Sequence, residues 1–278
     1  MKAPRLGYFR ARALDDVFAA LETHGGDAKI LAGGQSLMPA LNMRLLEPGL
    51  LIDINGIAGL DAIEERDGHL RIGALARHSA VGRSPAVARL APLIHQAIPH
   101  IAHAAIRNRG TFGGSLAQAD PAAELPACVV ALDAVLHLAS RRGTRQVRAL
   151  EFFRGLYETG LAADEILTAI DIPAARAGAR FAFVELARRR GDYAMVGLAA
   201  RAEKGSAPRL VFFGAGVKPV DAKAAARALV NGGLRAAQEA LADDLDPPAD
   251  LQGDAATKRH LARVLLARAV GALGGAAS

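Results

Sequence analysis

Cysteine is nearly absent from this chain, and its scarcity excludes two classes of protein. Among 278 residues there is one cysteine, Cys128, so a disulfide framework is impossible. An iron–sulfur cluster usually needs about four thiolate ligands, so this chain cannot hold one by itself. The lack of disulfides is typical of a reducing compartment, and we expect a cytoplasmic protein. Because Cys128 stands in an apolar segment, we interpret it as a packed rather than a reactive side chain.

Aromatic residues are also scarce. They make up 4% of the chain, and tryptophan is missing. The formal net charge is +6, with arginine clusters in the segments 141–145 and 188–190. Nucleic-acid binding would need a basic stripe with interleaved aromatic side chains on which bases stack. We therefore expect no nucleic-acid partner and interpret the basic clusters as solvated turns or a subunit surface.

Long hydrophobic runs are missing as well. No stretch approaches the roughly 20 apolar residues of a membrane span, so we expect none. The chain reaches Asp15 and Asp16 before any hydrophobic run develops, which disfavours a signal peptide. The composition, 51% apolar and 22% charged, is typical of a globular protein, and the length favours two or three subdomains.

Familiar nucleotide and metal motifs are missing or incomplete. The sequence has no G-x-x-x-x-G-K-[ST] segment, which disfavours a P-loop kinase or ATPase. The Gly-Ala-Gly segment 214–216 resembles the start of a Rossmann fingerprint, but Pro219 stands at the third glycine position, so we predict a strand-ending turn. His95, His100 and His103 lack a further ligand at a recognised spacing, so we expect no metal site and no catalytic side chain.

Two glycine pairs are the most informative feature that is present. The first glycine loop consists of Ala32, Gly33, Gly34, Gln35 and Ser36, and the second of Thr111, Phe112, Gly113, Gly114 and Ser115. Glycine permits positive φ and close approach of the backbone to a ligand, and successive backbone N–H groups form a nest for anions. Neither loop contains Lys or Arg, so backbone amides would neutralise the anion. The pattern predicts a bulky anion held from two sides, and a dinucleotide pyrophosphate is the natural candidate.

Apolar periodicity and turn residues predict three units, 1–56, 57–175 and 176–278. The first is a βαβ unit with its lead-in; we expect helices over 14–24 and 37–45 and strands over 29–32 and 50–54. The second has strands over 69–74, 134–140, 146–149 and 166–172. The third has strands over 180–187, 194–202 and 209–215, helices over 221–229, 234–241 and 257–273, and a disordered end over 274–278.

Polar residues at two helix starts suggest caps. Ser36 is placed to cap the helix that follows the first glycine loop. Asp120 followed by Pro121 predicts a second start, with Glu124 in the first turn and the helix running to about residue 132.

Longer motifs around the glycine pairs resemble a known family. Segment 32–39, Ala-Gly-Gly-Gln-Ser-Leu-Met-Pro, is similar to the first FAD loop of the medium, flavin-binding subunits of molybdenum hydroxylases, and segment 106–127 resembles their second FAD loop. This family includes the flavoprotein subunits of carbon monoxide dehydrogenase and of xanthine dehydrogenase-like enzymes. Residues 152–167 resemble the end of its flavin domain, and residues 189–194 its C-terminal domain.

The resemblance implies a fold and a set of cofactor contacts. The fold would be α+β, with a two-subdomain FAD-binding domain of the vanillyl-alcohol-oxidase/PCMH-like type and a smaller α+β C-terminal domain. Backbone groups of both glycine loops would hold the FAD pyrophosphate. Asp120 and Glu124 would lie toward the ribityl chain, and Leu167 and Tyr193 near the isoalloxazine ring. The pattern lacks a linking Cys or His, so the FAD would be noncovalent.

The resemblance also implies a function within an assembly. A large subunit would carry molybdopterin, a small iron–sulfur subunit would carry [2Fe–2S] clusters, and the complex would be a dimer of heterotrimers. Electrons would pass from the clusters to the FAD and then to NAD, a quinone, oxygen or another external acceptor. Gln35, Ser115 and Gln118 depart from residues common in the family. Two alternatives stay open: a stand-alone FAD reductase of the enolpyruvyl-sugar reductase type and a flavin-free assembly scaffold.

Overall fold

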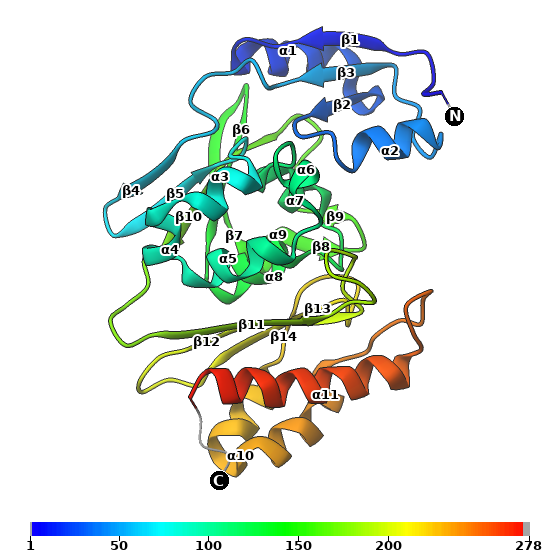
Figure 1. Cartoon of the computed structure of the whole chain (residues 1–278). Helices are drawn as coiled ribbons and strands as arrows, with labels where there is room; N and C mark the ends of the chain where they lie inside the picture. Colours follow the sequence, from blue (N-terminus) through cyan, green and yellow to red (C-terminus); the bar gives the residue numbers. More distant parts are fainter. Residues whose placement is uncertain (1, 275–278) are drawn as a thin grey trace.

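The computed structural model describes residues 2–274 and arranges them in three successive parts (Figure 1). The N-terminal part, blue, lies at one end; the middle part, cyan and green, follows; the C-terminal part, yellow to red, lies at the other end. Helices and sheets are mixed in each part, which confirms the α+β class. Of the end expected to be disordered, residues 275–278 lie outside the described range. Within that range, no helix has the length and apolar character needed to cross a membrane.

The N-terminal part is a three-stranded parallel sheet in the order β1-β3-β2. Its elements are β1 (Gly7–Arg10), α1 (Leu14–His24), the 3₁₀ helix η1 (Gly25–Asp27), β2 (Ala28–Leu31), α2 (Leu37–Asn42) and β3 (Leu50–Asp53). The helix predicted over 14–24 is confirmed at both ends. Its apolar side chains Val17, Phe18 and Leu21 recur at helical spacing and are buried in the core shared with this sheet.

The middle part is built on a five-stranded antiparallel sheet in the order β4-β5-β10-β6-β7. Its strands are β4 (Ile63–Arg66), β5 (His69–Gly73), β6 (Val135–Ser140), β7 (Gly143–Arg148) and β10 (Ile166–Pro173). The accompanying helices are α3 (His78–Arg83), α4 (Pro85–Leu90), α5 (Pro92–Ala97), η2 (Ile98–His100), α6 (Ala104–Arg107), α7 (Phe112–Gln118), α8 (Glu124–Ala131) and α9 (Ala149–Phe152). A small hairpin of β8 (Phe153–Gly155) and β9 (Glu158–Thr159) follows α9. The predicted hairpin pairing around residue 143 is confirmed.

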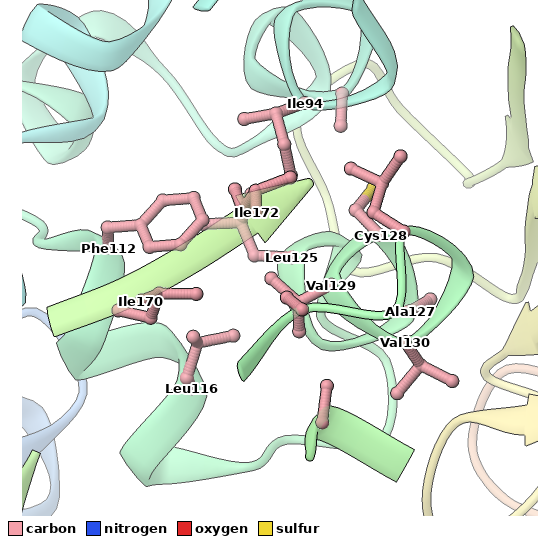
Figure 2. Close-up of a cluster of buried hydrophobic side chains, with 14 of the residues drawn as sticks. Ile94, Phe112, Leu116, Leu125, Ala127, Cys128, Val129, Val130, Ile170 and Ile172 are labelled. Carbon is pink, nitrogen blue, oxygen red and sulfur yellow. The ribbon is translucent and has the colours of Figure 1, made fainter. Parts of the chain in front are cut away.

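A hydrophobic core joins this sheet to its helices. Figure 2 shows Ile170 and Ile172 of β10 close to Phe112 of α7 and Leu125 of α8. Cys128 of α8 is fully buried in the same cluster, and burial raises the pKa of its thiol. The interpretation of this cysteine as a packed side chain is therefore confirmed.

The C-terminal part is a four-stranded antiparallel sheet that carries two helices. Its elements are β11 (Arg180–Leu186), β12 (Val196–Ala202), β13 (Arg209–Phe213), β14 (Val220–Asp221), α10 (Lys223–Asp244) and α11 (Ala255–Ala272). Helix α11 packs on β11 and β12, while α5 and α8 of the middle part contact the same sheet (Figure 1). Gly233, at φ +73°, kinks α10 between the two helices predicted from sequence. Gly214, at φ +70°, follows β13, which confirms the predicted strand-ending turn.

Two predicted caps are wrong. Helix α2 begins directly after Ser36, but the Ser36 side chain makes no capping hydrogen bond. Helix α8 begins at Glu124 rather than after Asp120. The Asp120 Oδ1 atom instead accepts the backbone N–H of Ala122 at 2.9 Å, an Asx-type turn that competes with capping.

Candidate functional site

The first glycine loop, between β2 and α2, has uncommitted backbone donors. Within residues 2–274, the backbone N–H groups of Gly34, Gln35 and Ser36 donate to no protein acceptor, and all three residues are partly or fully exposed. Gly34 has φ +70°, and the Gln35 side-chain amide donates back to the Gly33 carbonyl at 2.9 Å. Three successive free donors in a turn form a nest that suits an anion.

The second glycine loop differs from the prediction, because its glycines lie in the first turn of α7. The N–H of Phe112 donates to Ala76 at 2.8 Å, and that of Gly113 donates to Ala74 at 2.9 Å. The N–H of Gly114 donates to the Thr111 hydroxyl at 3.1 Å, which caps the helix. Because these three amides are already hydrogen-bonded, the segment forms a fixed surface and not a second anion-binding nest.

The two glycine segments meet at Gly33. A Cβ atom on Gly33 would lie 2.5 Å from the carbonyl oxygen of Arg109 and 2.8 Å from the Cα of Gly110. Those residues lead directly into the second loop. The structure therefore brings the two predicted loops together, at a spacing that only glycine permits.

An acidic and aromatic corner lies beyond the second loop. The Tyr157 hydroxyl donates to Asp120 Oδ2 at 3.2 Å. Partial burial, and then the neighbouring Asp120 carboxylate, raise the pKa of Tyr157 to about 12, so its phenol stays a neutral donor. Partial burial and the charges of Asp120 and Glu124 likewise raise the pKa of Tyr193, which is 60% exposed. Three of the predicted residues, Asp120, Glu124 and Tyr193, are thus neighbours.

Tyr157 is a candidate that the sequence reasoning missed. It stands in a segment that resembles the family, but nothing there marked its side chain. The structure places it at φ +54°, a left-handed conformation that is uncommon for a tyrosine and often marks a functional position.

Leu167 is placed differently from the other predicted residues. Its side chain lies in the core and is 4% exposed, so it presents no surface to a ligand. The strand β10 has a bulge between Leu167 and Ala169, and the carbonyl of Thr168 accepts the N–H of Ala74 at 2.9 Å. Since Ala74 also binds Gly113, the backbone of this strand supports the second glycine segment.

Glu124 is a buried acid next to this corner. It is 8% exposed, and burial, helped by the charges of Glu185 and Asp120, raises the pKa of Glu124 to about 8. One carboxylate oxygen of Glu185 lies 3.0 Å from His100 Nδ1. In the described chain its other carboxylate oxygen has no hydrogen-bond partner. With a pKa of about 8, Glu124 is mostly protonated at neutral pH.

Replacing Glu124 with glutamine is expected to flatten the pH dependence of stability. The carboxyl pKa is 4.5 in an ordinary setting and about 8 in the folded chain, so between these values the folded state keeps a proton that the unfolded chain releases. The free energy of unfolding therefore falls as the pH rises through that window. Melting temperatures at about pH 5 and about pH 8 measure the effect. Glu47→Gln, at an exposed position, should keep the wild-type slope; an unchanged slope in Glu124→Gln would contradict the assignment.

These observations define a class of protein. The anion nest lies where the N-terminal part meets the middle part, and the acidic and aromatic corner lies between the middle and C-terminal parts, as expected for a flavin-binding domain with an appended domain. Residues 4–175 match the family described as the FAD-binding domain in molybdopterin dehydrogenase, and residues 181–273 match the CO dehydrogenase flavoprotein C-terminal domain. The chain belongs to the FAD-binding medium subunits of the molybdenum hydroxylase family and is a flavoprotein oxidoreductase component.

Similarity to individual proteins extends over nearly the whole chain. The nicotine 6-hydroxylase medium subunit of Paenarthrobacter nicotinovorans is 37% identical, over 97% of this chain and 98% of that protein. The carbon monoxide dehydrogenase medium chain of Hydrogenophaga pseudoflava is 34% identical, over 98% of both. A solved structure of carbon monoxide dehydrogenase from Hydrogenophaga pseudoflava superposes with a TM-score of 0.95 at 34% identity and covers 100% of both chains.

Proposed function

We propose that the chain binds FAD noncovalently where its two glycine segments meet. The observation that carries the proposal is the row of uncommitted N–H groups of Gly34, Gln35 and Ser36, held against the second segment at Gly33. A pyrophosphate accepts hydrogen bonds from such a row without a basic side chain. The proposed contact set comprises Ala32, Gly33, Gly34, Gln35 and Ser36 on one side and Thr111, Phe112, Gly113, Gly114 and Ser115 on the other.

The remaining predicted residues would line the other end of the cofactor. We place Asp120 and Glu124 toward the ribityl chain and Tyr193 beside the isoalloxazine ring, with Leu167 contributing through its backbone. Tyr157 joins this set because it donates to Asp120 and can fix the direction of that carboxylate. An exposed tyrosine ring offers a flat apolar face to a flavin.

The proposed role is electron relay within a complex. Bound FAD supplies redox chemistry, so the chain needs no acid, base or nucleophile of its own. The single cysteine requires that any [2Fe–2S] clusters belong to another subunit, here a small iron–sulfur subunit, with molybdopterin in a large subunit. We propose a dimer of such heterotrimers, with 1–56 and 57–175 as the FAD-binding subdomains and 176–278 as the C-terminal domain of this chain.

Substrate choice would belong to the partner. The two relatives described above are named for nicotine and for carbon monoxide, two chemically unlike molecules, although each resembles this chain over nearly its whole length. This supports a subunit that handles electrons rather than substrate. The external acceptor would meet the flavin on this chain.

The test is purification of the tagged full chain together with the subunits that assemble with it. We expect one FAD per chain, released into solution on denaturation because it is noncovalent. Limiting dithionite should reduce clusters and flavin in succession, and ferricyanide should reoxidise both.

Other outcomes separate the alternatives. Flavin that stays on the denatured polypeptide would contradict noncovalent binding. A colourless but fully assembled complex would favour the flavin-free scaffold. Reduction of a dye by the isolated chain with NADPH, without partner subunits, would favour the stand-alone reductase.

A further inference from the structure

A hydrogen-bonded bridge lies behind the two glycine segments. Asn55, directly after β3, donates from Nδ2 to the carbonyl of Ala32 at 2.8 Å. Its Oδ1 accepts a hydrogen bond from Arg77 Nη2 at 2.6 Å. The other terminal nitrogen of Arg77 donates to the carbonyl of Arg109. One amide and one guanidinium thus connect the residue before Gly33 to the residues that lead into the second segment.

The bridge and the direct contact between the two segments share one atom, the carbonyl oxygen of Arg109. The Arg109 carbonyl oxygen that accepts from Arg77 is also the atom that a Cβ on Gly33 would approach most closely. The backbone of Arg77 pairs with Thr111 in an isolated antiparallel bridge, so its position is tied to the second segment. Its side chain reaches back to the first segment through Asn55. The Arg77 side chain therefore connects the two segments.

The bridge is oriented by a third residue. Asp53 Oδ1 accepts from both the backbone N–H and the side-chain Nδ2 of Asn55, at 2.9 and 2.6 Å, and Asp53 Oδ2 accepts from the Tyr8 hydroxyl at 2.5 Å. These contacts turn the amide so that its oxygen faces Arg77.

We propose that Arg77, acting through Asn55, is a positioning residue that sets the spacing of the two glycine segments and thereby the affinity for FAD. The inference rests on the proposed function, because it concerns the same cofactor. A planar guanidinium binds two acceptors in fixed directions, whereas a lysine ammonium is a single point donor. Neither Arg77 nor Asn55 needs to touch the cofactor for this role.

The first test compares FAD affinity among arginine variants of the full chain in its complex. The cofactor is stripped and returned by titration with FAD, followed by quenching of flavin fluorescence. Arg77→Met should weaken FAD binding by about tenfold or more, and Arg77→Lys should restore only part of the loss. The matched control is Arg71→Met, because Arg71 also makes a two-point contact, with Asp171 at 2.6 and 2.7 Å, but forms no hydrogen bond to either glycine segment. It should change the FAD affinity by less than about twofold.

A second measurement separates positioning from general stability. Asn55→Leu should weaken FAD binding like Arg77→Met, and the double variant should be no weaker than the worse single variant, because both changes break one bridge. The visible circular dichroism of the residual bound FAD should change in the Arg77 variants but not in Arg71→Met. Losses that multiply in the double variant, or an unchanged affinity in Arg77→Met, would overturn the inference. Failure of the wild-type complex to bind FAD would instead overturn the proposed function.

Discussion

Replacing Gly33 with alanine is expected to abolish FAD retention. The new Cβ would lie 2.5 Å from the Arg109 carbonyl oxygen and 2.8 Å from the Gly110 Cα, and both neighbours are backbone atoms that cannot rotate away. The first glycine loop must therefore move off the second segment, carrying with it the donors of the nest. Because each hydrogen bond to a charged acceptor contributes about 1.5–3 kcal/mol, losing two donors of the nest should weaken FAD affinity by about a hundredfold or more.

Gly26→Ala is the matched control for this substitution. Gly26 precedes β2 in the same part of the chain, and a Cβ there would have no heavy atom within 4 Å. This variant should purify with the wild-type ratio of flavin to protein, measured by visible absorbance after removal of free FAD. Full flavin occupancy in Gly33→Ala would contradict the placement of the pyrophosphate at the first glycine loop.

Local sequence signals predicted those parts of the fold that local interactions determine. Helix α1 lies over the predicted residues because its buried side chains follow one helical face. The β6–β7 hairpin follows from two alternating segments around a glycine turn. Strand β1 was not predicted. All four of its residues are exposed, and it exists because it pairs with β3, some forty residues away in sequence.

The candidate site was predicted in part from the sequence, and the errors of that prediction have a physical cause. Glycine is a poor helix former, so the pair Gly113–Gly114 reads as a loop. In the folded chain it lies inside α7, because packing on Ala74 and the Thr111 cap outweigh that propensity. The sequence Asp120-Pro121 fits either a helix cap or a turn, and only the tertiary structure selects the turn.

The supporting contacts of the site could not be read from the sequence at all. Asn55 and Arg77 connect elements that are far apart along the chain, and no motif surrounds either residue. Tyr157 and Asp120 likewise meet only through the β8–β9 hairpin. Motifs locate the residues that touch a common ligand, but not the residues that hold those motifs in place.

Gly113→Ala is expected to destabilise the fold itself, even without FAD. A Cβ on Gly113 would lie 2.5 Å from the Cβ, 2.7 Å from the Cα and 2.8 Å from the carbonyl oxygen of Ala74. The two residues are also joined by the hydrogen bond from the Gly113 N–H to that oxygen, so they cannot separate without breaking it. Overpacking a fully buried contact of this kind costs about 1–3 kcal/mol of unfolding free energy.

Urea denaturation of the FAD-free chain measures this loss, with Gly271→Ala as the control. Gly271 is also a helical glycine, but a Cβ there would have no heavy atom within 4 Å. Alanine at that position should therefore be neutral or stabilising, by up to about 1 kcal/mol, because it favours the helix. A Gly113→Ala chain that unfolds at the wild-type urea midpoint would show that α7 can move away from β5. In that case the second glycine segment would not be a fixed surface against which the first glycine loop holds its anion.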